Sequence, residues 1–570
     1  MHRIRPSFMN TLRRPLARRL FACSAAVCAA AQVSAEIAPE WVARLPVGSS
    51  LSAGIQDMVT DAAGVSYVTG VNGPSYNTDA YTAAIGPDGT KLWEHAYNGT
   101  LDWHDQARGI CLGPGGIVYV VGNAPGTGKY ANVLLLKYDA ASGALLNTVQ
   151  YSSGLFMSEH GAAVATDAAG NVYITGGTVG DGPDVLMLKF DDQGNFQWKH
   201  TWDGPAWSPY SQDHGLDVLV GPDGNPVAMI HGVMNSLHPD YVVIKYEAAN
   251  GSVLWEANWG VNGGDFPADM EIDAIGDVYV TGTGLNFNDM FSTIKLRGTD
   301  GQLLWQAYDS NGIDDYGRAV ALDGAGGVYI TGSVDPDGDR SNFNDNIYTV
   351  KRRADDGSLV WSHTYGDNCK GCYDAPSDVR VDPAGNVFVG GGTSSAPYSG
   401  DMITLVLDAS TGNEIDRGLV YGGSSESAGS GIMCFDASWN LYNGADIGNY
   451  DTGEVDISVV KFTSLVGDLY QMSVTNLVGG SDATFSITNA TPNQKQYLAY
   501  SLKGRGSTFV PQLNVTLDLA SPKQAASGRA DASGAWETML HVPGMATGRT
   551  VWFQSAEQGR TTPVLDQVVQ

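Results

Sequence analysis

The chain has 570 residues and a formal net charge of −29 at pH 7. Such acidity disfavours a polyanionic partner, so we expect neither nucleic acid nor an anionic membrane surface as a ligand. The length exceeds one ordinary domain and suits a large repeat domain with a small companion. No internal segment approaches the roughly 20 apolar residues that a transmembrane helix needs.

Residues 1–35 have the features of an export signal. Six arginines and no acid accompany a modest apolar stretch at 20–31, and Val33-Ser34-Ala35 offers a small-residue cleavage site. Arg18-Arg19-Leu20-Phe21 resembles a twin-arginine motif, which implies export after folding; an ordinary secretory signal remains the alternative. We therefore expect an exported protein that is secreted, periplasmic or at the cell surface.

The stretch 315–366 shows the unit from which most of the chain is built. It contains four short β-rich runs joined by turns such as Asp323–Gly327, where glycine allows the chain to reverse. The runs are 319–322, 328–331, 347–351 and 359–365. They predict one small antiparallel sheet, which can bury its faces only against further copies of itself.

The second-strand aromatic marks eight copies of this unit, with a period of roughly fifty residues. The aligned positions are Tyr67, Tyr119, Tyr173, Val227, Tyr279, Tyr329, Phe388 and Tyr442. A fourth-strand tryptophan recurs, and we expect it to form a wedge between neighbouring units. It stands at Trp93, Trp198, Trp255, Trp305 and Trp361. The repeat predicts an all-β fold, an eight-bladed β-propeller.

The eighth copy lacks its fourth strand, and Pro39–Leu45 has the missing pattern. Pairing that segment into the last blade would remove two exposed strand edges and close the ring. We therefore assign 36–465 to the propeller. From Val466 the period disappears, and short β runs separated by Gly, Asn and Pro predict a small β-sandwich domain over 466–570.

The repeat resembles the SBBP-type β-propeller repeat of exported bacterial proteins. The likeness is carried by Asp315-Tyr316-Gly317, by Asp323–Gly332 and by Lys351, and it is best in blades two to seven. It implies the fold and no particular ligand. Residues 506–511 give the terminal domain a likeness to a module that ends other secreted bacterial repeat proteins, and this likeness implies no function.

The second-to-third and fourth-to-first connections of such blades share one face, here called the variable face. In this chain they differ in length and composition, and variable loops on a rigid scaffold are where binding sites are usually placed. Six blades carry an acid on this face, just before the innermost strand: Asp105, Glu159, Asp213, Asp265, Asp315 and Asp374. A cation site is one interpretation. Recurrence in nearly every blade favours the other, hydrogen bonding to neighbouring loops.

Histidines distinguish one sector of the acid ring, because His104, His160 and His214 each adjoin one of its acids. A His–carboxylate cluster suits a transition metal or acid–base chemistry, whereas the alternative is a position that merely requires a flat ring. The predicted divalent-cation ligands are Asp105, Glu159, His160, Asp213 and His214.

Asp335, Asp337 and Asp339 alternate as at the start of a calcium loop. Arg340 stands where an EF-hand has glycine, so the alternative is an uncoordinated acidic turn. Calcium or another divalent cation is therefore the cofactor that the sequence leaves open.

Two pairs of cysteines remain after the leader. Cys369 and Cys372 lie between blades six and seven, and export favours a local disulfide between them. Tyr373 stands where a c-type haem motif requires histidine. Cys111 and Cys434 occupy the same position in blades two and eight, so we expect them to stay reduced and apart.

Two functions fit these patterns. The first is an exported, non-catalytic scaffold, monomeric, that binds a protein or carbohydrate on the variable face. The alternative is an enzyme that uses the channel mouth, either divalent-metal-dependent or a quinoprotein (PQQ-type) oxidoreductase. Turns such as Glu247–Trp255 resemble the tryptophan-docking motif of those oxidoreductases, but they have an adjacent cysteine pair where this chain has a spaced Cys-x-x-Cys.

Overall fold

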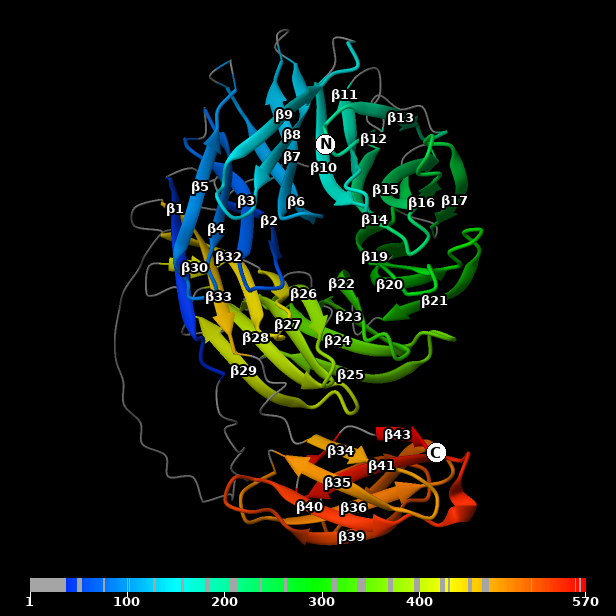
Figure 1. Cartoon of the computed structure of the whole chain (residues 1–570). Helices are drawn as coiled ribbons and strands as arrows, with labels where there is room; N and C mark the ends of the chain where they lie inside the picture. Colours follow the sequence, from blue (N-terminus) through cyan, green and yellow to red (C-terminus); the bar gives the residue numbers. More distant parts are fainter. Residues whose placement is uncertain are drawn as a thin grey trace, which may run out of the picture. The chain divides into compact units, whose positions relative to one another are not determined.

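The computed structural model describes residues 37–48, 54–74, 77–99, 101, 103–126, 130–154, 158–179, 185–205, 213–235, 238–260, 264–286, 288–309, 315–335, 345–366, 373–393, 400–420, 426–428, 431–449, 454–463, 471–488, 490–513, 515–558, 560–562 and 565–570. Apart from one 3-10 turn at Gly544–Ala546, these residues form strands, turns and loops with no α-helix (Figure 1). None of the described segments is a helix able to cross a membrane.

Seven four-stranded antiparallel sheets follow one another along the chain, each with its strands in sequence order. The first sheet contains β2 (Gly54–Thr60), β3 (Ser66–Asn72), β4 (Asp79–Ile85) and β5 (Lys91–Tyr97), and the second contains β6 (Gln106–Gly113), β7 (Ile117–Pro125), β8 (Ala131–Asp139) and β9 (Leu145–Tyr151). The third sheet contains β10 (Ser158–Thr166), β11 (Val172–Val179), β12 (Val185–Phe190) and β13 (Phe196–Trp202). The fourth contains β14 (His214–Val220), β15 (Pro226–Asn235), β16 (His238–Tyr246) and β17 (Val253–Trp259).

The fifth sheet contains β18 (Phe266–Ile272), β19 (Val278–Asn286), β20 (Asn288–Leu296) and β21 (Leu303–Asp309). The sixth contains β22 (Tyr316–Leu322), β23 (Gly327–Val334), β24 (Asn346–Arg353) and β25 (Leu359–Tyr365). The seventh contains β26 (Ala375–Val381), β27 (Asn386–Thr393), β28 (Asp401–Asp408) and β29 (Glu414–Val420).

One further sheet joins the two ends of this region. It contains β30 (Glu426–Ala428), β31 (Ile432–Phe435), β32 (Leu441–Asn449), β33 (Val455–Phe462) and β1 (Trp41–Gly48). Strand β1 pairs antiparallel with β33, Trp41 opposite Lys461 and Leu45 opposite Ile457. The pairing expected for the N-terminal segment is thus confirmed, and it extends three residues beyond Leu45.

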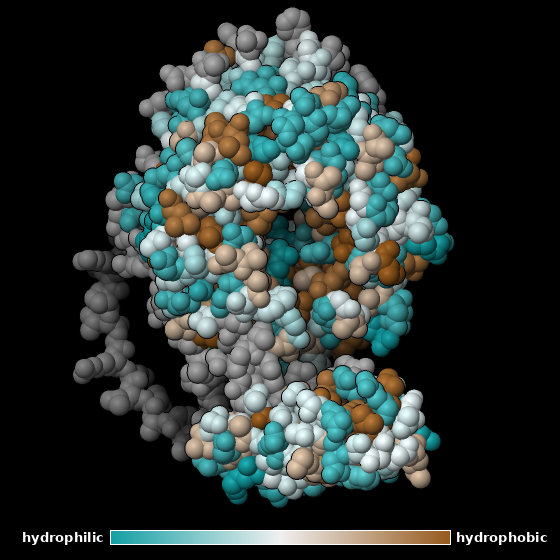
Figure 2. Space-filling view, in the orientation of Figure 1, coloured by the Kyte–Doolittle hydropathy of each residue, from teal (hydrophilic) through white to brown (hydrophobic). Residues whose placement is uncertain are grey.

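The innermost strands pack in a closed succession. Each of β2, β6, β10, β14, β18, β22 and β26 contacts the next, β26 contacts β31, and β31 contacts β2. The space that these strands enclose is called the channel below, and Figure 2 shows it as a hollow in the molecular surface. The sheets therefore form the repeat arrangement of a β-propeller.

Trp305 shows what holds neighbouring sheets together. Its indole N–H donates to the carbonyl oxygen of Ala354 in the next sheet (3.1 Å), and its ring covers Gly357, where a Cβ atom would lie 2.7 Å from it. Lys295 donates to the same carbonyl (3.2 Å) and lies over the ring of Tyr279. Because that turn glycine has φ of 71°, the contact requires both its conformation and its missing side chain.

The same wedge recurs around the ring and includes the N-terminal strand. Its members are Trp41, Trp93, Trp198, Trp255, Trp305 and Trp361, whose indoles donate to Pro87, Ala140, Ala248, Gly298, Ala354 and Ala409. Asn147 replaces the tryptophan in the sheet of β6–β9 and donates to Gln193 (3.0 Å). The wedge role expected from the sequence is confirmed.

Residues after 470 form a separate set of strands. One sheet contains β34 (Gln471–Thr475), β35 (Asp482–Thr488) and β40 (Trp536–His541); a second contains β39 (Lys523–Arg529), β36 (Lys495–Ser501), β41 (Thr550–Glu557), β42 (Arg560–Thr561) and β43 (Leu565–Val568); a third pairs β37 (Arg505–Val510) with β38 (Val515–Leu519). Phe485 from the first sheet meets Leu498 and Phe553 from the second in one buried core.

Candidate functional site

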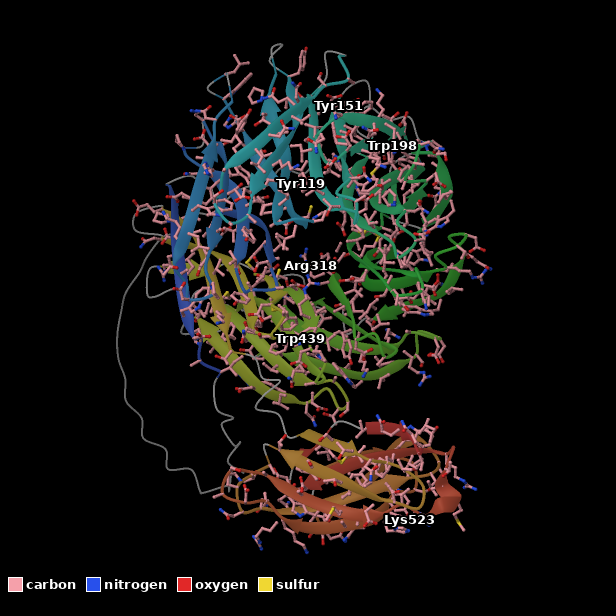
Figure 3. The ribbon with its side chains drawn as sticks, viewed as in Figure 1. Tyr119, Tyr151, Trp198, Arg318, Trp439 and Lys523 are labelled. Carbon is pink, nitrogen blue, oxygen red and sulfur yellow. The ribbon has the colours of Figure 1, made fainter. Side chains whose placement is uncertain are left out.

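A β-bulge in each of seven innermost strands sets the side chains that line the channel. One extra residue interrupts the register with the second strand each time, and such a bulge re-aims side chains. The extra residues are Gln56, Arg108, Ala162, Leu216, Ala268, Arg318 and Ser377. Arg108 and Arg318 are exposed there, and Figure 3 labels Arg318 beside the channel.

Four aspartates follow these bulges: Asp57, Asp217, Asp269 and Asp378. Each accepts a hydrogen bond from the amide of its own successor. Three also accept the amide of a residue in the next innermost strand, which is Ile110, Val320 and Met433 in turn. The channel carboxylates therefore connect neighbouring sheets.

Burial disfavours the ionised form of these channel acids and so raises their pKa values. It raises the pKa of Asp57 to about 6 and the pKa values of Asp217, Asp269 and Glu271 to about 7. Arg380 counters them with ion pairs to Asp378 (3.2 Å) and Glu271 (3.4 Å), and Asp378 beside it raises the pKa of the guanidinium. One arginine thus partly neutralises the acidic wall.

The six acids predicted on the variable face are all nearly inaccessible to solvent, at 1% exposure or less. Asp105 accepts a hydrogen bond from the amide of Gly99 (2.8 Å). Asp213 accepts from Gly204 (3.0 Å) and from Val233 (2.6 Å). Glu159 likewise accepts the amide of Ser153 (3.0 Å). Gly99, Ser153 and Gly204 lie in connections from the preceding sheet, so these three acids hydrogen-bond to a neighbouring loop, as the hydrogen-bonding interpretation expected.

Two of the three predicted histidines lie together. The rings of His160 and His214 are 6.0 Å apart, and His231, which the sequence did not single out, stacks 6.4 Å beyond His214 and 5.1 Å from Phe266. Burial lowers the pKa of His160 to about 4, with a smaller contribution from Arg108, and it also lowers the pKa of His214. His160 and His214 are therefore uncharged near neutral pH. The three rings of His160, His214 and His231 are called the histidine row below.

The remaining predicted ligands are placed differently. His104 lies near Thr78 (Nδ1 to Oγ1, 3.2 Å), and Asp335 is buried with its amide bonded to Asp315 (3.3 Å). Asp337, Asp339, Cys369 and Cys372 lie outside the described residues. Within the described ranges no group of three or more His, Cys, Asp or Glu side chains could hold a metal ion. The cation site, the calcium loop and the disulfide stay predictions.

Cys111 and Cys434 are free thiols on β6 and β31, and both are partly buried. Burial raises the pKa of each to about 12, so neither is a thiolate at neutral pH.

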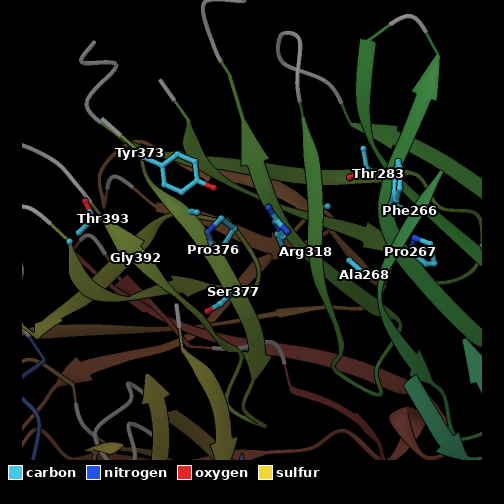
Figure 4. A pocket seen from close by; sticks show the side chains of 13 residues that line it. Phe266, Pro267, Ala268, Thr283, Arg318, Tyr373, Pro376, Ser377, Gly392 and Thr393 are labelled. Carbon is cyan, nitrogen blue, oxygen red and sulfur yellow. The ribbon is translucent and has the colours of Figure 1, made fainter. Parts of the chain in front are cut away.

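A pocket of about 720 Å³ opens on the variable face between β18, β22 and β26. It is lined by the following residues: Phe266, Pro267, Ala268, Thr283, Gly317, Arg318, Tyr373, Ala375, Pro376, Ser377, Gly392, Thr393 and Gly400. Figure 4 shows Arg318 between Ala268 and Pro376, with Tyr373 and Phe266 to either side. Two aromatic side chains in it are well exposed, Phe266 at 44% and Tyr373 at 47%. We call it the Arg318 pocket.

The opposite face, which carries the first-to-second and third-to-fourth turns, also has pockets. A pocket of about 530 Å³ lies between the turns at Asp273–Gly276 and Gly324–Gly327, and a smaller one of about 280 Å³ includes Glu271 and Arg380. The exposed Ile275, which is 78% accessible, lines the larger one.

No protein-family model matches the chain, and no curated protein sequence does. Among solved structures, Sqt1 from Chaetomium thermophilum is similar over 74% of this chain and 100% of its own, with 10% identity and a TM-score of 0.47. Quinohemoprotein alcohol dehydrogenase from Comamonas testosteroni is similar over 76% and 79%, with 12% identity and a TM-score of 0.43.

The WD40 domain of SCAP from fission yeast is similar over 74% of this chain and 98% of its own, with 10% identity and a TM-score of 0.42. These values are too low to support an argument, and the neighbours include both a WD40 domain and an oxidoreductase. The description of the fold rests on the strand pairing itself.

Proposed function

We propose that the chain is an exported, non-catalytic binding scaffold of the SBBP-repeat type. In this proposal 36–465 forms one eight-bladed propeller closed by the N-terminal strand, and 466–570 forms a β-sandwich. The ligand binds at the channel mouth on the variable face. The observation that carries the proposal is the Arg318 pocket, where a guanidinium and two exposed aromatic rings lie together at the channel mouth.

The use of the other polar groups supports binding over catalysis. The repeated acids of the variable face accept backbone amides, and the repeated lysines and tryptophans donate to backbone carbonyls of the next sheet. A general acid or base must be able to reach a substrate proton, and groups already bonded to the backbone and inaccessible to solvent are poorly placed to do so. The exposed side chains of the pocket are available for contact instead.

A pair of variants tests where the ligand binds. The parent, a Phe266→Ala/Tyr373→Ala variant and an Ile275→Ala variant are applied to glycan and peptide arrays. The first variant should lose the signals that the parent gives, because it removes the exposed rings of the mouth, and Ile275→Ala on the opposite face should keep them. Signals lost only in Ile275→Ala would place binding on the wrong face and overturn the proposal.

A divalent cation beside the histidine row is a second candidate, favoured by the contact of His160 with His214. Calorimetric titration with calcium, zinc and manganese, on the parent and on an Asp213→Ala/His214→Ala variant, tests it. We expect a heat of binding that the variant lacks, and equal binding by both proteins would rule this cluster out. An ultraviolet–visible spectrum of protein from its native host separates both proposals from a bound quinone, which absorbs where protein does not.

A further inference from the structure

The guanidinium of Arg318 has no hydrogen-bond acceptor among the residues that the structure describes. Its one contact with a described residue is the ring of Tyr316, 5.9 Å from the guanidinium carbon, and within the described ranges it makes no ion pair or hydrogen bond. Other arginines of the described ranges pair closely with acids, such as Arg352 with Asp309 and Arg353 with Asp355. Arg318 therefore lines a pocket with no carboxylate partner among the described residues, although the protein has a net charge of −29.

Arg108 repeats this arrangement on the far wall of the channel. It occupies the same bulge position four sheets away in the closed succession of eight, which places it opposite Arg318. Its partners are neutral: Gln106 accepts from Nη2 (3.0 Å) and Asn123 from Nε (3.3 Å). Two cationic groups therefore face the channel mouth without neutralising acids among the described residues.

The surroundings of Arg318 favour a hydroxylated ring as the neighbour of the anion. Phe266 and Tyr373 expose ring surface on which the C–H face of a sugar can pack. The hydroxyl group of Ser377 donates to the carbonyl oxygen of Gly390 (3.1 Å), so its oxygen keeps lone pairs for a ligand hydroxyl. The net negative charge repels ligands with densely spaced anions, which nucleic acids and strongly acidic peptides carry.

From these contacts we infer that the Arg318 pocket binds an acidic sugar, a uronate residue within a glycan whose carboxylates are separated by neutral sugars. The carboxylate accepts both parallel N–H bonds of the Arg318 guanidinium, and the sugar ring packs against Phe266 or Tyr373. Arg108 is placed to meet a second carboxylate of a longer glycan. This inference rests on the proposed binding function and adds the chemical class of the ligand.

The test is calorimetric titration with a hyaluronan tetrasaccharide, in which glucuronate alternates with a neutral sugar, and with its carboxyl-reduced, uncharged form. The proteins are the full-length parent, Arg318→Ala and Arg353→Ala. Arg353 is a matched control because it is exposed on the opposite face and its loss changes the net charge equally.

The parent should bind the acidic tetrasaccharide, and Arg318→Ala should weaken binding by roughly 10- to 150-fold, the value of a charge-assisted hydrogen-bonded contact. The parent should bind the carboxyl-reduced tetrasaccharide more weakly than the acidic one by a similar factor. Arg318→Ala should bind the two forms equally. Arg353→Ala should bind as the parent does.

Three results would overturn the inference. Equal binding of both tetrasaccharides by the parent would leave a site at the mouth but remove the carboxylate from recognition. Binding of a glutamate-rich peptide instead, lost in Arg318→Ala, would assign the pocket to a peptide and exclude the sugar. Binding of neither tetrasaccharide would exclude the sugar class, while the array experiment with the Phe266→Ala/Tyr373→Ala variant still decides the proposed function independently.

Discussion

Replacing Asp217 by asparagine should reduce the loss of folding stability that the protein undergoes between pH 5 and pH 8. The carboxyl accepts one hydrogen bond, from the amide of Val218 (2.7 Å), and asparagine Oδ1 can accept the same bond. Burial, with smaller contributions from the nearby Asp57 and Glu271, raises the Asp217 pKa from 3.8 to about 7. A carboxyl whose pKa rises on folding contributes stability below its unfolded pKa and loses that contribution as the pH rises through the folded value.

The size of the effect follows from the two pKa values. Between pH 5 and pH 8 the unfolded carboxyl is ionised throughout, whereas the folded one ionises only near pH 7, so the parent loses at most about 3 kcal/mol through this group. Asp217 is partly exposed to water in the channel, which reduces the expected loss to about 1–2 kcal/mol. The side chain of the Asp217→Asn variant cannot ionise, so this variant should keep that stability between pH 5 and pH 8.

Urea unfolding at pH 5 and at pH 8, followed by tryptophan fluorescence, measures the difference. The wedge tryptophans report on the packing between sheets, so the fluorescence follows the ring. Asp300→Asn is the control, because Asp300 is an exposed turn residue and its variant should keep the pH dependence of the parent. If Asp217→Asn and the parent lose the same stability between these pH values, the argument from burial is refuted.

Two further predictions concern the ends of the ring and its thiols. Deleting residues 36–48 should cause aggregation or loss of cooperative unfolding, because it removes Trp41 and leaves β33 without its partner; calorimetry that shows unchanged melting would contradict this closure. Mass mapping of the non-reduced exported protein should find Cys369 bonded to Cys372, with Cys111 and Cys434 alkylated only after unfolding. A Cys111–Cys434 disulfide would be incompatible with their strands.

The sequence predicted the sheets well because the repeat supplied many copies of one pattern. In the unit 315–366, the four expected runs lie inside β22, β23, β24 and β25, which extend up to three residues beyond them. The wedge and the pairing of β1 were also predictable, since a missing strand in one copy had to be supplied from elsewhere. In the terminal region five runs were expected, at 470–475, 483–488, 496–502, 513–519 and 551–554, and they correspond to β34, β35, β36, β38 and β41. The strands β37, β39, β40, β42 and β43 were missed, β39 and β40 because their sequences are largely polar or exposed.

The site was predictable only in part, because strand alternation does not reveal a bulge. Arg318 is itself the extra residue between Gly317 and Ala319, and a bulged residue does not follow the regular alternation from which its direction would be predicted. His231 was missed for another reason. It lies on a second strand, β15, and reaches the histidine row only through the antiparallel pairing of β14 with β15, where it is opposite His214.

The pairing of β1 with β33 also sets the order of events during synthesis. The strand that begins at Trp41 is translated first, but its partner begins at Val455, and a ribosome needs roughly 20–80 s to make the residues between them. Until then every other sheet can form from neighbouring strands, while the first strand has no partner and exposes the side chains of Leu45 and Val47, which are buried in the finished ring. The nascent chain therefore carries an unpaired strand with exposed apolar side chains for most of its time on the ribosome. A chaperone or export factor that binds extended apolar strands could bind this segment during that time.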